Sequence, residues 1–212
     1  KKGNHIITLE TEHKAILDTC KHLEKAGAEV TYLKVNEDGM IDLENLESVI
    51  KPSTILVSVM WANNETGVVQ QMREIALICE KHGVLFHSDA TQAVGKIPTL
   101  PRETGIHLMS FTAHKMYGPK GIGGLYVSRK NPRVKVTAQM DGGGHERGMR
   151  SGTLNVPGIV GFGKAAEIAK NEMKQDAERL SKLRDKLQSA LTKLEETKIN
   201  GKTDHRMPHV TN

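Results

Sequence analysis

The sequence has few cysteines, few aromatic side chains and no long apolar run, and each shortage excludes a class of protein. Its two cysteines, Cys20 and Cys79, show no CxxC spacing and no histidine at ligand spacing, which argues against a zinc site or a disulfide framework. Aromatic residues are 3% of the chain, too few to stack many bases of a nucleic acid. The longest apolar stretch, residues 55–62, is interrupted by Ser58 and is far too short to cross a bilayer. We therefore expect no metal, no direct contact with nucleic acid and no membrane segment.

The sequence does contain a mild excess of positive charge and an ordinary supply of apolar residues. The net charge is +5, and the basic residues are spread over the whole chain. Such a distribution suits small anionic ligands better than a nucleic-acid surface. With 37% hydrophobic residues, the 212-residue chain can form one full globular domain, or one domain and a piece of another.

Strand and helix patterns alternate along most of the chain. Strands are expected at residues 5–10, 29–35, 54–60, 84–87, 106–111 and 124–127, and helices at residues 12–26 and 71–82. Asp42 is expected to cap a further short helix. An alternating series of this kind predicts an α/β fold with a mostly parallel sheet flanked by helices.

From about Gly161 the pattern changes to one long amphipathic helix. Its apolar stripe includes residues seven positions apart, namely Met173, Leu180, Leu187 and Leu194. A stand-alone coiled coil is the alternative, but only about three heptads are regular and Arg184 interrupts the seam. We expect an intramolecular helix that connects two domains.

Lys115 lies among hydroxyl, imidazole and glycine residues in the stretch 110–121, a setting that suits an amine beside an anionic ligand. An amine so placed can form a Schiff base with an aldehyde. Asp89 ends an expected strand, at the edge where open α/β sheets bind ligands. Pyridoxal phosphate needs a lysine, an acid near its ring nitrogen, donors for its phosphate and a group that fixes its ring. Lys115 and Asp89 suit the first two roles, while Gln92, Thr112 and His114 suit contacts with the ring or the phosphate.

Each of these residues also has a purely structural explanation. Asp89 could cap a turn, His13 and His114 could be surface histidines, and residues 63–67 could form only a turn. The combination, rather than any single residue, indicates a cofactor site. Competing motifs fail: the glycines at 118–124 complete neither a P-loop nor GxGxxG, and Met149 stands where HExxH requires histidine.

At these positions the chain resembles the cysteine desulfurases of iron–sulfur cluster assembly, pyridoxal-phosphate enzymes of aminotransferase class V. The matching stretches are residues 11–14, 63–67, 87–92, 110–124 and 142–153, so the resemblance covers nearly the whole chain. It implies a fold-type-I transferase, with residues 1–165 as the cofactor-binding large domain, lacking its N-terminal part. Residues 166–212 would be the connecting long helix and the beginning of a smaller C-terminal α+β domain.

The resemblance also implies a role for each matching residue. Lys115 would bind the cofactor aldehyde and move protons, and His13 would stack on the ring and assist catalysis. Asp89 would pair with the pyridine nitrogen. The full implied cofactor-binding set is His13, Asn64, Asp89, Gln92, Thr112, His114, Lys115 and Thr153. Thr153 would reach the phosphate of the other subunit, so a homodimer is expected.

The family converts L-cysteine to L-alanine and passes persulfide sulfur to iron–sulfur scaffold and acceptor proteins and to tRNA thiolation, in the bacterial cytoplasm or the mitochondrial matrix. Its catalytic cysteine lies beyond the point where this sequence ends, and neither Cys20 nor Cys79 occupies such a loop. We therefore expect a central fragment that is inactive alone. The alternatives are another class V enzyme, such as a selenocysteine lyase or an aminotransferase, and a noncatalytic split-gene product that acts as a dimer partner.

Overall fold

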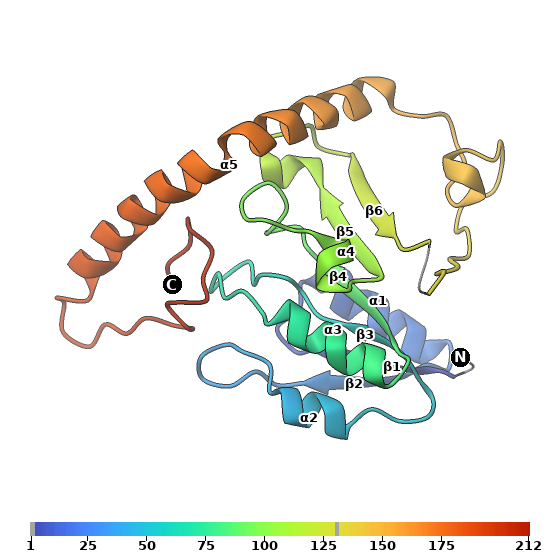
Figure 1. Ribbon diagram of the computed structural model, residues 1–212, viewed down its shortest axis with the longest axis horizontal. Helices are drawn as coiled ribbons and strands as arrows, with labels where there is room; N and C mark the ends of the chain where they lie inside the picture. Colours follow the sequence, from blue (N-terminus) through green and yellow to red (C-terminus); the bar gives the residue numbers. More distant parts are fainter. Residues whose placement is uncertain (1–2, 130–131) are drawn as a thin grey trace.

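A six-stranded sheet forms the centre of the computed structural model, which describes residues 3–129 and 132–212 (Figure 1). The strands are β1 (His5–Leu9), β2 (Glu29–Leu33), β3 (Thr54–Ser58), β4 (Leu85–Asp89), β5 (Leu108–Thr112) and β6 (Gly123–Val127), in the spatial order β2-β1-β3-β4-β5-β6. All neighbouring pairs are parallel except β5 and β6, which are antiparallel. The predicted α/β fold with a mostly parallel sheet is confirmed.

Helices connect the strands. They are α1 (Lys14–Lys25), α2 (Leu43–Ser48), α3 (Met72–Lys81), α4 (Pro101–Thr104) and α5 (Val156–Leu191), with 3₁₀ turns η1 (Ala113–Met116) and η2 (Glu146–Gly148). Asp42 caps α2 as predicted, because its Oδ1 accepts the N–H groups of Glu44 and Asn45 at 2.9 and 3.0 Å. None of the described helices has the length and apolar character that a membrane span requires.

The long helix α5 differs from its predicted bounds at both ends. It begins at Val156, because Asn155 caps it by accepting the Gly158 N–H at 3.1 Å. It ends at Leu191, so Leu194 lies outside the stripe to which its spacing assigned it. In Figure 1, α5 is one long helix that begins after the orange loop, passes η1 near the end of β5 and extends beyond the sheet.

The core lies along the middle of the sheet. Ile7, Val57 and Phe86 are aligned across β1, β3 and β4, and none of the three is exposed. From α3, Ile75 and Cys79 pack against this row, also fully buried. Burying a side chain of this size contributes about 1.5–3 kcal/mol relative to leaving it in water.

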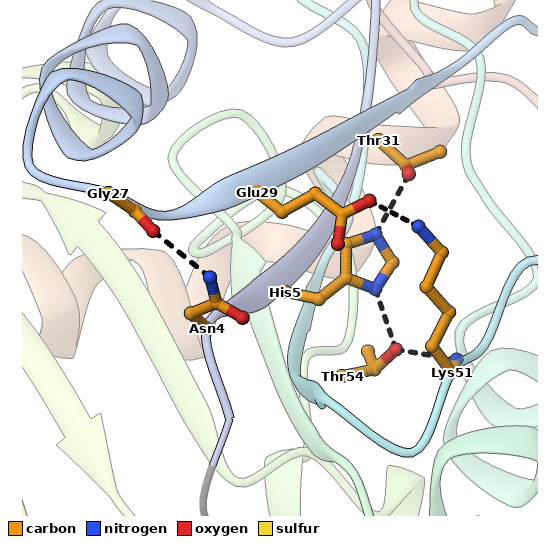
Figure 2. Close-up of polar contacts among 7 residues, drawn as sticks. All are labelled: Asn4, His5, Gly27, Glu29, Thr31, Lys51 and Thr54. Atoms are coloured by element: carbon orange, nitrogen blue, oxygen red, sulfur yellow. Dashed lines mark hydrogen bonds and ion pairs between the residues drawn. The ribbon is translucent and has the colours of Figure 1, made fainter.

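At the amino-terminal edge, His5 joins three strands (Figure 2). Its Nδ1 lies 2.7 Å from Thr54 Oγ1 and its Nε2 lies 2.8 Å from Thr31 Oγ1. Lys51 donates its backbone N–H to the Thr54 hydroxyl at 2.8 Å and pairs through its ammonium with Glu29. Burial and the nearby Lys51 lower the pKa of His5, so the neutral imidazole is favoured here.

The last residues of the chain return to the loop after β3 (Figure 1). Val69 donates its N–H to His205 O, and Met207 donates its N–H to Gly67 O, both at 2.8 Å. Met207 is fully buried in the same hydrophobic cluster as Trp61. Met207 thus contributes to the core described above. The start of a second domain in residues 166–212 remains a prediction.

Candidate functional site

All the predicted cofactor residues except Thr153 follow the carboxyl ends of adjacent strands. His13 follows β1 and Asn64 follows β3, while Asp89 ends β4 and Thr112 ends β5. Because these strands are parallel and adjacent, their carboxyl ends share one edge of the sheet. Gln92 lies in the turn after Asp89, and His114 and Lys115 lie in η1 directly after Thr112.

Asp89 is held firmly at this edge. Its side chain is mostly buried, with 9% of the residue exposed, and its Oδ1 accepts the Thr91 N–H at 2.9 Å. Its backbone carbonyl accepts the Trp61 N–H at 2.9 Å, which ties β4 to the end of β3. The carboxylate therefore has a fixed position, as a partner for a cationic ring nitrogen requires.

The η1 turn presents Lys115 outward from a buried base. Ala113 and Met116 are buried, whereas His114 and Lys115 are exposed. Thr112 Oγ1 lies 2.9 Å from His114 Nδ1 and donates to Ile122 O at 3.2 Å. A hydroxyl, an imidazole and an amine are thus grouped within four positions of the chain.

Close packing behind η1 restricts its backbone. A Cβ added at Gly118 would lie 2.9 Å from the Ala113 Cβ and 3.2 Å from the Ala165 Cβ of α5. Tyr117, which ends the turn, has φ = 63°, in the left-handed region. The turn that carries Lys115 is therefore wedged between β5 and α5.

His13 and Asn64 are exposed and have structural roles as well. His13 caps α1, since its Nδ1 accepts the Ala15 N–H at 3.2 Å. Asn64 lies in a turn that its neighbour Asn63 organises, because Asn63 Oδ1 accepts the N–H groups of Glu65 and Thr66, both at 2.9 Å. Residues 63–67 therefore form a turn, and this turn lies at the same sheet edge as Asp89, so the turn structure and the predicted role of Asn64 are compatible.

Thr153 does not join the other residues. The loop that carries it, coloured orange before α5, lies at the opposite side of Figure 1 from the carboxyl ends of β1, β3 and β4. Within this chain the loop therefore stands apart from the strand ends that carry the other predicted residues. The predicted role in another subunit's site is untested.

The sequence analysis predicts no role for two residues near the site, His87 and Glu12. His87 lies within β4, where its Nδ1 is 2.8 Å from Ser58 Oγ and its Nε2 is 3.2 Å from Ser110 Oγ. Burial lowers the pKa of His87, so it links β3, β4 and β5 as a neutral ring. Glu12 is buried beside His13. The alternation of His87 with the inward-facing residues of its strand is the only sequence signal for the position of His87. No local pattern indicates that Glu12 is buried.

The donor set fits pyridoxal phosphate. Asp89 Oδ2 and Lys115 Nζ have no hydrogen-bond or ion-pair partner among residues 3–129 and 132–212, so both groups can receive a ligand. Thr112 and His114 provide a hydroxyl and an imidazole for a phosphate. The residues present thus match the acid, amine and phosphate donors that this cofactor needs.

Known proteins resemble the chain over its whole length. The aminotransferase class-V family profile matches residues 1–212. A protein of Histophilus somni (strain 2336) named cysteine desulfurase IscS is 58% identical over 206 residues, which are 97% of this chain and 51% of that protein.

Solved structures agree with this result. A NifS-like protein superposes with a TM-score of 0.92 at 42% identity, covering 98% of this chain and 56% of that one. A structure described as SspA in complex with cysteine has a TM-score of 0.74 at 41% identity, covering 78% of this chain and 47% of that one. The chain spans about half the length of the curated relatives that it matches.

Proposed function

The chain belongs to the aminotransferase class-V family, and on that premise we propose that it is the cofactor-binding core of a pyridoxal-phosphate-dependent cysteine desulfurase. Relatives at 55–58% identity that are named cysteine desulfurase support this function, as does a similar protein whose structure is described with cysteine. The observation that carries the proposal is the fixed, buried carboxylate of Asp89 one strand away from the exposed amine of Lys115.

Lys115 and Asp89 have the central roles in this proposal. When bound, the cofactor withdraws electrons from the substrate Cα. Asp89 stabilises the protonated ring nitrogen that this withdrawal requires. Lys115 would hold the cofactor through its aldehyde, and its amine would hold and move the proton of the substrate Cα. Its outward position on η1 gives the amine room for both tasks.

The remaining residues of the site hold the cofactor. Thr112 and His114 bind the phosphate, Gln92 contacts the phenolic oxygen, and Asn64 orients the ring and the substrate. His13 covers the ring face. Thr153 contacts the phosphate in the second subunit of a homodimer, which agrees with a loop that stands apart from its own chain's site.

The sulfur step needs a thiolate that the described cysteines do not offer. Cys20 and Cys79 are both buried, and burial raises the pKa of each thiol, that of Cys79 to about 12. The thiolate is the nucleophilic form, so neither residue suits attack on the substrate sulfur. We propose that this chain alone binds L-cysteine but does not release alanine. In a longer protein that contains this chain and supplies the thiolate, the sulfur would pass on to iron–sulfur scaffold and acceptor proteins and to tRNA thiolation. This protein would act in a bacterial cytoplasm or a mitochondrial matrix.

Cofactor titration tests the proposal. Adding pyridoxal phosphate to the purified chain is expected to shift the absorbance of the cofactor, and Lys115→Ala abolishes the shift. Lys120→Ala is the matched control, because Lys120 is an exposed lysine in the same glycine-rich stretch and has no proposed role. A folded chain that gives no shift, or a shift that survives Lys115→Ala, contradicts the proposal.

Product analysis tests the substrate. Added L-cysteine should change the absorbance of the loaded chain without releasing L-alanine, whereas a longer protein that contains this chain should release alanine. If the longer protein leaves cysteine unchanged but acts on selenocysteine or transfers an amino group, the chain belongs to a different class V enzyme.

A further inference from the structure

Glu12 is a buried acid at the same sheet edge, and none of the roles above uses it. Only 5% of the residue is exposed, although it lies between exposed Thr11 and exposed His13. Its Oε1 accepts the Met60 N–H at 2.5 Å. Its Oε2 is buried and has no hydrogen-bond partner among the described residues.

Glu12 belongs to a set of contacts that joins three strand ends. Through Met60 it fixes the end of β3, and Asn63 Nδ2 adds a second link by donating to Thr11 O at 3.0 Å. The Trp61 N–H then continues the connection to the Asp89 carbonyl at 2.9 Å. The loops that carry His13, Asn64 and Asp89 are therefore connected through the neighbourhood of Glu12.

The surroundings of Glu12 disfavour a negative charge. The pKa of Glu12 is raised to about 8: burial is the largest cause, the carboxylate of Asp89 on β4 also raises the pKa, and the hydrogen bond from the Met60 N–H opposes both. From α1 the titratable group that faces Glu12 is the thiol of Cys20. The neutral form also agrees with the burial of the group, since Oε1 accepts from the Met60 N–H while no cation pairs with either carboxyl oxygen among the described residues.

We propose that Glu12 is a positioning residue that works as a neutral acid, holding the His13 and Asn64 loops together without adding a second buried negative charge beside Asp89. The part of this inference that concerns the cofactor rests on the proposed function. A charged Glu12 would place a second carboxylate near Asp89, and like charges favour protonation of one of them. A protonated Asp89 would no longer stabilise a cationic ring nitrogen.

The first test needs no cofactor and measures unfolding of the full 212-residue chain by denaturant between pH 5 and pH 9. A glutamate that releases its proton near pH 4.5 when unfolded and near pH 8 when folded makes stability fall as pH rises through that window. Glu12→Gln should remove this decline, and the exposed Glu10→Gln should retain it. Equal pH dependence in all three proteins would overturn the inference.

The second test measures the affinity for pyridoxal phosphate by absorbance. Glu12→Gln keeps the size and neutrality of the acid, so its affinity at pH 7 should stay within about three-fold of the original, whereas Glu12→Leu lowers affinity about ten-fold or more because it leaves the Met60 N–H unpaired. Above pH 8 the affinity of the unmodified chain should fall and that of Glu12→Gln should not. A Glu12→Gln variant that binds as weakly as Glu12→Leu would show that the carboxylate charge is needed.

The two tests separate the inference from the proposed function. If no version of the chain binds the cofactor while the unfolding data show a neutral Glu12, the proposed function is wrong. The inference that Glu12 is a neutral acid in the folded chain then still holds. If Glu12→Leu does not fold, the comparison between the original chain and Glu12→Gln decides both tests.

Discussion

Replacing His5 by leucine probes the hydrogen bonds that join β1, β2 and β3. The change keeps a buried apolar volume but removes the contacts to Thr54 and Thr31, which are worth about 1 kcal/mol each. Thr54 is fully buried, so the loss of the His5 partner of its hydroxyl adds about 1–3 kcal/mol to the cost of the substitution. Thr31 is only half-buried, so its hydroxyl can bond to water instead. We expect His5→Leu to lower the free energy of unfolding by about 3–5 kcal/mol in denaturant titrations at pH 7.

The pH dependence gives this prediction a second readout. The pKa of His5 is lowered in the folded chain, so the unfolded chain binds a proton more readily as pH falls below 6.5. Stability is therefore lost on acidification, and His5→Leu should weaken this loss. His22→Leu, which makes the same replacement at an exposed position of α1, serves as the control and should change little. Equal effects of the two substitutions would refute the reasoning.

Three further predictions concern packing. Gly67→Ala should cost about 2–4 kcal/mol, because a Cβ at φ = 75° would lie 2.6 Å from the Val210 Cβ; thermal unfolding measures the loss, and an unchanged midpoint would contradict it. Phe86→Ala should cost about 3–5 kcal/mol by opening a cavity in the centre of the sheet, and a loss below about 1 kcal/mol in denaturant titration would argue against that packing. Cys79, fully buried with its pKa raised to about 12, should react with a thiol reagent at pH 8 only after unfolding, so rapid labelling of the folded chain would be inconsistent with its burial.

The sheet edge could be predicted from the sequence because each of its parts is local. Alternating apolar runs indicate the strands, and a polar residue at the end of such a run, such as Asp89 or Thr112, lies at the carboxyl edge of a parallel sheet. The residues that align this edge could not be predicted in the same way. Glu12 resembles an exposed acid in its own segment, and its burial depends on Met60, which lies 48 positions further along the chain.

The ends of α5 and the C-terminal segment show the same limit. Periodicity detects the helix but not the Asn155 cap that starts it at Val156. Met207 stands in a polar stretch that resembles a loop, yet hydrogen bonds to the turn after β3 bring it into the core. Such placements depend on contacts between distant segments, and no window of neighbouring residues contains that information.

The identity of the lysine that binds pyridoxal phosphate tests the central claim most directly. Lys96 is the alternative lysine that this experiment must distinguish from Lys115. Burial and the neighbouring Lys115 lower the pKa of Lys96, and its Nζ lies 3.4 Å from Gln92 Oε1. Borohydride reduction of the chain with bound cofactor, followed by proteolysis and mass spectrometry, locates the modified residue. The account predicts the cofactor mass on Lys115 alone. A modification on Lys96, or one distributed among the surface lysines, would contradict it.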